Sequence, residues 1–420
     1  MATNTLLTPT MITRKALMVL HQKCNFISNV NRQYDDRFAV DGAKIGDSIN
    51  IRMPAKYTVR SGATLAAQED YHRSTPLTVS SQVGVDLSFT TKELTMDIDD
   101  FSERVIDPAM AQLAAHIENA CLQSAYKLVN NYTNGLTNAT LTYKNFAQGG
   151  ANMTMELAPT SKRAAIMNPM TAVDFNDAVK GLFHSSTQIS QQYAEGMMGR
   201  TSGFDVYENT LAPSHTTGTL AGTPLSDGTN QGISSTTNVW SSQTIIQIDG
   251  ATSGTTLLAG DIITFDTCTA VHPESKASTG KLMRFVVQAD ATLTTAGTGA
   301  AVTIKPAMIH GSGNAYKNCV ISGGSTDGLT VTLLGAVGTA HNNDLQFCKE
   351  SFVFGTADLV DVSKFGAWGA RESMDGISMR IAKQYAIGSD TVPCRLDVLY
   401  GFAGLYPETA NRIVTPMSLL

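Results

Sequence analysis

The feature that most constrains this chain is a glycine-rich segment, residues 214–340, because its composition disfavours helices. Its 127 residues hold 17 of the 35 glycines but only 12 charged residues, and Ser and Thr are dense. Short apolar runs alternate with turn signals such as Asp249-Gly250 and Asp327-Gly328. Short strands separated by such turns are typical of a small all-β barrel or sandwich. Because the flanks are mixed α and β, we expect a domain inserted into a host fold. The expected strands lie at Ile245–Ile248, Ile262–Phe265, Met283–Val287, Val302–Ile304 and Leu329–Leu333.

The composition of the whole chain excludes several classes of protein. Its 420 residues are 42% hydrophobic and 16% charged, which predicts a folded chain of two to three domains. The longest apolar stretch, Val398–Tyr406, is shorter than the roughly 18 residues of a membrane span, so we expect no membrane association. The N-terminus has no basic start followed by an apolar run, so no secretory signal is expected. A pI of about 5.7 argues against a protein that wraps nucleic acid. No two of the six cysteines lie within 25 residues of each other, which favours reduced thiols in a cytoplasmic protein.

The N-terminal 34 residues are basic and contain no Asp or Glu. Their apolar spacing over Met11–Val30 predicts a short basic amphipathic helix. Two interpretations remain open: contact with an acidic partner, or an ordinary terminal helix packed on its own domain. The basic residues concerned are Arg14, Lys15, Lys23 and Arg32.

A two-stranded excursion is predicted between residues 45 and 90. Apolar residues alternate over Ile49–Met53 and again, with a period of two, over Leu77–Phe89. Between them lies a polar stretch, Tyr57–Ser74. An isolated ribbon is marginally stable in water, so it either contacts a partner or pairs within its own sheet. Charged residues near its tip are Arg60, Glu69, Asp70 and Arg73.

Two helix starts are marked by an N-cap residue followed by proline. Asp107-Pro108 predicts a long helix from Pro108 to about Asn131, preceded by a shorter one that ends near Ile106. Asn168-Pro169 predicts a second start, with Ala172, Phe175, Val179 and Leu182 on one face. Further strands are expected at Phe352–Val362, Ile377–Tyr385 and Arg395–Tyr406.

No motif of catalysis or cofactor binding is found in the sequence. There is no phosphate loop, no H-E-x-x-H and no G-x-S-x-G, and no two of the eight histidines lie within 25 residues of each other. Gly297-Thr-Gly299 starts like a dinucleotide motif but lacks the third glycine and the strand-to-helix context. We therefore expect no enzyme activity, no cofactor and no metal site.

The order of segments along the chain resembles the major capsid proteins of tailed bacteriophages. The likeness is strongest to the coat proteins of short-tailed lambdoid Salmonella phages, which carry an extra inserted β-barrel. The residues that carry it, in order, are Asn168-Pro169, Gly199-Arg200, Gly203–Val206, Gly260–Phe265, Phe285–Val287, Ile304–Pro306, Arg395–Gly401 and Pro407-Glu408.

The resemblance implies an α+β tailed-phage capsid fold with an inserted all-β barrel domain. Its expected parts follow the chain in order. They are an N-terminal arm (1–44), an extended E-loop (45–90), a peripheral domain with a spine helix (91–133), a core of axial and peripheral α+β structure (134–213 and 341–420), and the inserted barrel (214–340).

The resemblance also implies a function and a set of partners. Subunits would form hexamers and pentamers of an icosahedral procapsid with a scaffolding protein, in the host bacterial cytoplasm. The shell would expand as double-stranded DNA is packaged through a portal protein, without sequence-specific DNA binding. A decoration protein is left open. The extended loop would reach across a neighbouring subunit, and the inserted domain would lie on the outer surface.

Two alternatives and one departure from the family accompany this interpretation. An encapsulin-like compartment on the same fold would carry a cargo enzyme, and simple compartments lack a β insert. A carbohydrate-binding or hydrolytic enzyme finds support only in the β-rich segment, with acids such as Asp261 and Asp266. In Thr219–Ser241 the only ionised side chain is Asp227, so contacts there would depend on hydrogen bonds from Ser, Thr and Asn rather than on salt bridges.

Overall fold

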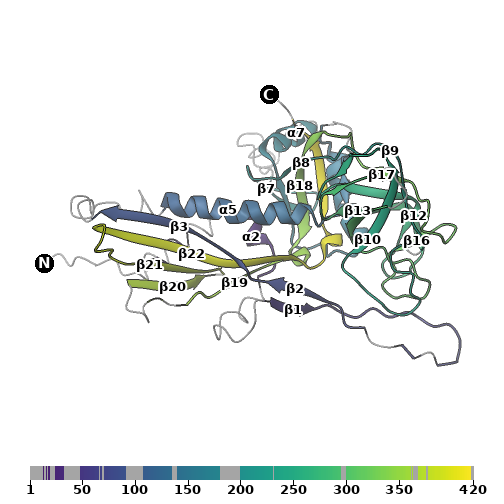
Figure 1. The fold of residues 1–420 in the computed structure, drawn as a ribbon, viewed down its shortest axis with the longest axis horizontal. Coiled ribbons are helices and arrows are strands. Elements are labelled where there is room, and N and C mark those ends of the chain that lie inside the picture. Colours follow the sequence, from purple (N-terminus) through teal and green to yellow (C-terminus); the bar gives the residue numbers. More distant parts are fainter. Residues whose placement is uncertain are drawn as a thin grey trace, which may run out of the picture. The chain divides into compact units, whose positions relative to one another are not determined.

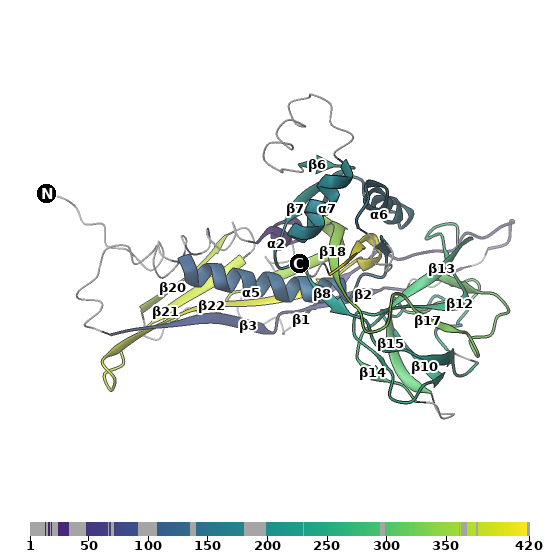
Figure 2. The same cartoon turned by 90° about the horizontal axis from the view of Figure 1, so that it is seen from above.

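The computed structural model, drawn in Figures 1 and 2, divides into two compact units. The first comprises Met1–Ile51, Pro76–Leu122 and Phe352–Leu405; the second comprises Arg52–Thr75, Gln123–Ser351 and Tyr406–Leu420. The structure describes residues 13, 16, 18, 24–32, 48–65, 67–68, 71–90, 107–134, 140–179, 199–229, 231–294, 299–360, 362, 368–374 and 377–417.

The first unit is built on a five-stranded antiparallel sheet. Its longest strand, β22 (Thr391–Gly404), buries every second residue from Val392 to Tyr400, which is the period of a strand with one face in the core. Asp397 on this strand is also buried, and its carboxylate binds Arg380 across 2.6 Å. The other strands are β3 (Ser81–Thr90), β19 (Phe352–Ala357), β20 (Trp368–Met374) and β21 (Ile377–Lys383). The three strands predicted after residue 350 are present, although the first ends at Ala357 rather than Val362, and β20 was not predicted.

The single strand predicted over Leu77–Phe89 is wrong, because the chain changes partner at Val79. Residues Ser74–Thr78 form β2, which pairs with β1 (Ser48–Arg52) in a two-stranded sheet. From Ser81 onward β3 pairs with β22 over ten residues. The alternating pattern continues through the break because the apolar residues of both strands are buried or partly buried and the residues between them are exposed. Periodicity therefore could not reveal the change of partner.

Helix α5 (Asp107–Tyr126) begins where Asp107-Pro108 predicted, but it ends earlier than Asn131. Leu128 N–H donates to the Ala125 carbonyl across 3.0 Å in a tight final turn. The chain then enters β4 (Tyr132–Thr133), which pairs with the C-terminal strand, and this pairing ends the helix. Figures 1 and 2 show α5 running along the sheet of the first unit. The shorter helix predicted before Ile106 lies outside the described residues.

Part of the predicted N-terminal helix is described as α2 (Asn25–Asn29). It packs within the first unit: Phe26 N–H donates to Oε1 of Glu118 on α5 across 3.1 Å, and the Phe26 ring lies 5.8 Å from that of Phe352. For residues 25–29, these contacts support the second interpretation, a terminal helix packed on its own domain. Arg14, Lys15 and Lys23 lie outside the described residues.

The second unit contains a seven-stranded mixed sheet covered by helices α6 (Tyr143–Met155) and α7 (Pro169–Val179). The predicted start of α7 is confirmed, since Oδ1 of Asn168 accepts the Met170 N–H across 3.0 Å. Helix α6 was not predicted. Phe146 and Phe175 bring the two helices into one apolar core. The strands of the sheet are β4, β23 (Asn411–Pro416), β18 (Ala340–Cys348), β5 (Arg163–Met167), β7 (Phe204–Glu208), β6 (Arg200–Thr201) and β8 (Ser214–Thr216).

The glycine-rich segment is all β over its described residues, as predicted. Its main sheet is antiparallel and encloses its own apolar core. An isolated bridge joins Leu225 and Thr330. Leu225 is on the first strand of this sheet along the chain, and Thr330 directly precedes the last. All five predicted apolar runs contribute to its strands. These are β9 (Gly222–Ser226), β10 (Thr244–Ala251), β12 (Ile262–Val271), β13 (Ser278–Val287), β15 (Ala300–Lys305), β16 (Cys319–Ile321) and β17 (Val331–Leu333), and a separate pair is formed by β11 (Thr256–Leu257) and β14 (Ala291–Thr292).

Two further expectations concern cysteines and membranes. All six cysteines are buried and none forms a disulfide. Within the described ranges, none of the helices combines the length and apolarity that a membrane crossing requires.

Candidate functional site

The glycine-rich segment joins the seven-stranded mixed sheet of the second unit, here called the core sheet, through two paired strand ends. These strand ends are called the neck (residues 213–218 and 338–343). β8 and β18 run antiparallel there, with His215 opposite His341. Beyond the strands, Thr217 N–H donates to the Thr339 carbonyl across 3.1 Å and Gly338 N–H to the Gly218 carbonyl across 3.2 Å. The entering and leaving chains are therefore held together by backbone hydrogen bonds.

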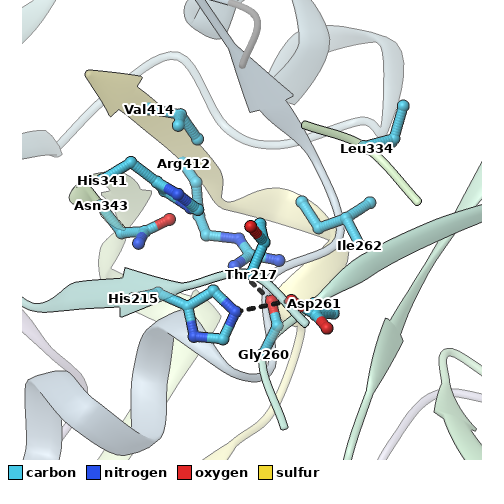
Figure 3. A pocket seen from close by; sticks show the side chains of 10 residues that line it. All are labelled: His215, Thr217, Gly260, Asp261, Ile262, Leu334, His341, Asn343, Arg412 and Val414. Atoms are coloured by element: carbon cyan, nitrogen blue, oxygen red, sulfur yellow. Dashed lines mark hydrogen bonds and ion pairs between the residues drawn. The ribbon is translucent and has the colours of Figure 1, made fainter. Parts of the chain in front are cut away.

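A buried pair, His215 and Asp261, links the neck to the turn directly before β12 (Figure 3). Nε2 of His215 and Oδ1 of Asp261 are 2.8 Å apart. Asp261 also accepts the Leu258 N–H across 2.7 Å and the Gly218 N–H across 3.1 Å. The carboxylate thus has donors from both the neck and the turn that precedes β12. Such saturation lets a charged group stay buried.

Arg412 lies on β23 of the core sheet and binds Gly260, in the turn directly before β12 (Figure 3). Its Nη1 donates to the Gly260 carbonyl across 3.0 Å, and its guanidinium carbon lies 5.9 Å from the Tyr126 ring centroid. Burial lowers the pKa of Arg412 to about 10. It therefore remains charged at neutral pH. The core sheet and the glycine-rich segment are joined here by a charge-assisted hydrogen bond.

The two histidines of the neck have different surroundings. The Tyr126 hydroxyl lies 3.4 Å from Nδ1 of His215, so both ring nitrogens of this histidine have partners. Burial lowers the pKa of His341 to about 4, and the neighbouring His215 and Arg412 act in the same sense. His341 is therefore neutral at pH 7. Its ring packs edge-on against that of His215, with centroids 5.5 Å apart.

The chain Tyr126–His215–Asp261 has the residue types of a proton relay, but its surroundings suit a structural role. The cavity beside it has a volume of about 10 Å³, close to the least that admits one water molecule. A small-molecule site is usually on the order of 300 Å³ or more. Asp266, the other acid considered from the sequence, accepts the Thr330 N–H across 2.6 Å. Both acids therefore bind main chain. Among the described residues, no group of His, Cys, Asp or Glu is arranged to hold a metal ion.

The residues proposed from the sequence as assembly contacts are distributed over several places. Arg73 is buried and packs against Tyr316 and Tyr406. Oδ2 of Asp227 accepts the Gly299 N–H across 3.1 Å, inside its own segment. Arg60 is exposed, and Arg32 is partly exposed after α2. The structure does not bring these residues together, and their contacts with other subunits remain predictions. Arg14, Lys15, Lys23, Glu69 and Asp70 lie outside the described residues.

Sequence reasoning missed the residues of the neck. Asp261 was noted only as a candidate acid, and His215 and His341 only as scattered histidines. The partners are separated by 46 to 152 residues, so no local motif unites them. The one available signal was a rare charged residue, Asp261, next to a glycine and directly before an apolar run.

Comparison with known proteins identifies a family. The sequence model of the family described as "P22 coat protein - gene protein 5" matches residues 1–412 of the chain. No curated protein sequence gives a significant match.

Similar solved structures include phage capsids. A chain of Mycobacterium phage Che8 has a TM-score of 0.46 at 10% identity, covering 92% of this chain and 89% of that chain. The capsid of Helicobacter pylori bacteriophage KHP30 has a TM-score of 0.44 at 9% identity, covering 88% and 85%. The CUS-3 coat protein I-domain is 22% identical with a TM-score of 0.18, covering 30% of this chain and 100% of that chain. Because these scores lie below 0.5, the family match alone carries the assignment.

Proposed function

The chain belongs to the P22 coat protein family, and from this premise we propose how it builds a phage shell. It is a major capsid protein, so many copies form an icosahedral bacteriophage capsid. We propose that hexamers and pentamers assemble around a scaffolding protein in the host cytoplasm, with a portal protein at one vertex and a decoration protein as an optional outer partner. The family match over residues 1–412 carries this function and does not favour an encapsulin-like compartment.

The charge of the subunit supports a container for DNA. The formal net charge is −6 at pH 7. A negative wall repels phosphate, so packaged double-stranded DNA can move along it without being gripped. The shell would therefore enclose double-stranded DNA without sequence-specific binding.

We propose that residues 214–340 form an inserted barrel domain on the outer surface of the shell. Three observations support this: a separate apolar core, the Leu225–Thr330 bridge between the sheet's end strands, and the paired strands of the neck. The His215–Asp261 pair and Arg412 would fix the orientation of this domain on the core sheet.

We propose that the loop between β1 and β2, here called the β1–β2 loop (residues 53–73), contacts a neighbouring subunit. Large apolar side chains on it are exposed: Val59 fully, Leu65 by 82% and Tyr57 by 61%. Exposed apolar residues on one extended loop are typical of an interaction surface. A charged residue at Val59 should impair assembly while leaving the monomer folded.

The basic arm is proposed to contact an acidic surface of the scaffolding protein or of another subunit. Its support is the absence of any acidic residue from the first 34 positions. Reversing the charge of Arg14 and Lys15 should reduce procapsid yield or scaffold incorporation. Unchanged assembly would contradict this contact.

The experiment that tests the whole proposal is expression of the full chain with its scaffolding protein, followed by electron microscopy of the lysate. Closed shells of uniform size are expected, with scaffolding protein inside. A folded monomer that never forms shells would contradict the assignment.

A further inference from the structure

Two strands of the core sheet place polar side chains beside the cavity of the neck. In the register of β18 and β23, Asn343 faces Val414 and Leu345 faces Arg412. Residues paired in this way, and residues two apart along a strand, lie on the same face of a sheet. Asn343 and Arg412 are therefore diagonal neighbours on one face, and His341 shares that face. All three line the cavity (Figure 3).

Asn343 and Arg412 are buried, yet part of each side chain lacks a protein partner. Asn343 is 0% exposed and Arg412 is 1% exposed. Among the described residues, no hydrogen-bond partner is found for Nδ2 and Oδ1 of Asn343 or for Nε and Nη2 of Arg412. The great majority of buried polar atoms in proteins are paired, either with protein or with ordered water. These atoms therefore point to a small molecule between the two side chains.

The polar groups around the cavity do not satisfy these atoms. Diagonal neighbours in a sheet are about 7 to 8 Å apart, and neither amide atom of Asn343 bonds to the guanidinium of Arg412. Nη1 of Arg412 donates to the Gly260 carbonyl, which leaves its other nitrogens without a partner among the described residues. The carboxylate of Asp261 also lines the cavity, but it is already bound by His215 and by two main-chain N–H groups.

The cavity has the size of one water molecule. Its volume of about 10 Å³ is about the least that a water molecule requires, so an organic ligand does not fit. Part of its wall is apolar and is formed by Ile262, Leu334 and Val414. The hydroxyl of Thr217, another lining residue, donates to the Ala336 carbonyl. The unpaired groups available to an occupant are therefore those of the two core-sheet side chains.

The unpaired atoms select the chemistry of the occupant. Arg412 offers only donors, whereas the amide of Asn343 offers both donors and an acceptor. A cation would be repelled by the guanidinium. An anion would be repelled by the carboxylate of Asp261, and it would leave Oδ1 of Asn343 without a donor. A water molecule can accept from Arg412 and donate to Oδ1 of Asn343, and it adds no charge to the interior.

We infer that the cavity of the neck is a binding site for a single water molecule, which bridges the guanidinium of Arg412 and the amide of Asn343. Because Nη1 of Arg412 also binds Gly260, this water forms part of the link between the core sheet and the glycine-rich segment. The site lies within one chain. It is therefore expected in the monomer, and its test does not depend on whether shells form.

A crystal structure of the full chain, at a resolution that shows ordered water, tests the site directly. Crystals grown in sodium bromide separate water from an anion, because bromide scatters anomalously. One peak is expected at hydrogen-bond distance, about 2.7 to 3.2 Å, from both Arg412 and Asn343, without an anomalous signal. A cavity without a peak, or a peak with an anomalous signal, would overturn the inference.

A substitution at Asn343 tests whether the water bridges the two side chains. Asn343→Leu keeps the branched shape of the side chain but removes both amide atoms, so the water loses one of its partners. The unfolding equilibrium constant of the full-length monomer, measured in urea, should therefore rise about ten-fold. If no water bridged the two residues, the same change would remove two unpaired buried atoms and leave the stability equal or higher.

Two further variants serve as controls. Oδ1 of Asn176 on α7 also has no partner among the described residues, but Asn176 does not line the cavity. Asn176→Leu should therefore not raise the unfolding constant. Asn343→Ser keeps a hydroxyl and leaves room for a second water, so it should retain the peak and unfold closer to wild type than Asn343→Leu does. Wild-type stability of Asn343→Leu, or loss of the peak in Asn343→Ser, would overturn the bridge.

Discussion

His215 and Asp261 are 46 residues apart in sequence, yet Nε2 of one and Oδ1 of the other are 2.8 Å apart in a buried pair. One residue lies on the strand that leads into the glycine-rich segment, and the other begins a central strand of that segment. Their contact adds a side-chain link to the backbone pairing that joins the two sheets.

Replacing Asp261 by Asn should weaken this link. The amide keeps the shape but loses the negative charge that binds His215, and it cannot accept from all three of its donors. Loss of hydrogen bonds to a buried charged group costs about 2 to 3 kcal/mol of unfolding free energy. Urea denaturation of the full-length monomer measures this change. Asp249→Asn, on β10 of the same segment, should change stability by about 0.5 kcal/mol or less. Equal effects of the two variants would contradict the role of Asp261.

His341 should make the chain sensitive to acid. Its pKa is about 4 in the folded state and ordinarily about 6.5, so protons bind the unfolded state more tightly between these values. Stability contributed by neutral His341 is present above about pH 6.5 and is lost as the pH falls toward about 4. The loss amounts to about 2 to 3 kcal/mol. His341→Gln should remove it, so the unfolding free energies of variant and wild type should converge on acidification. Parallel pH curves would refute this prediction.

Asp344 should show the opposite pH dependence. Complete burial raises its pKa to about 7. The Asn168 N–H donates to Oδ1 across 2.7 Å, and this hydrogen bond acts in the opposite direction, lowering the pKa. The ionised form therefore destabilises the fold above about pH 7, and this effect fades as the pH falls toward 3.8. Asp344→Asn should raise the unfolding free energy at about pH 8 by about 1 to 3 kcal/mol, have a smaller effect at about pH 5 and little effect at about pH 4. Asp174→Asn on α7 is the control. A destabilised variant at the higher pH would disprove the interpretation.

Two adjacent glycines of α6 should respond differently to alanine. A Cβ at Gly149 would lie 1.7 Å from Oε1 of Gln346 and 2.7 Å from Nδ2 of Asn411, both buried beneath the helix. Gly149→Ala should therefore lower the unfolding free energy by about 3 kcal/mol or more, since either the backbone of α6 or the hydrogen-bonded side chains beneath it must shift. At Gly150 the nearest atom is a ring carbon of Phe204 at 3.1 Å, and the gain in helix propensity of about 1 kcal/mol offsets the contact. Thermal melting of both variants checks the contrast. Similar melting temperatures would show that α6 can move away from the sheet.

The elements predictable from sequence were those with a strong local signal. Asn168-Pro169 marked the start of α7 because capping is decided by neighbouring residues. The apolar runs of the glycine-rich segment marked its strands for the same reason. In contrast, the strand predicted through Leu77–Phe89 was broken at Val79, and the helix expected to reach Asn131 stopped at Tyr126. In both places pairing with a distant strand decided the boundary.

The sequence by itself determined that residues 214–340 are all β, that the rest is mixed α and β, and that the chain resembles a phage coat protein. Composition and short-range spacing are enough for these conclusions, because they depend on residues that are neighbours along the chain. Only the tertiary structure decided that Asp261 meets His215, that Arg412 reaches Gly260, and that the Tyr316 hydroxyl accepts the Lys56 N–H. These contacts join residues 46 to 260 positions apart. A buried polar group has to find its partner wherever the fold places one, and no local pattern records where that is.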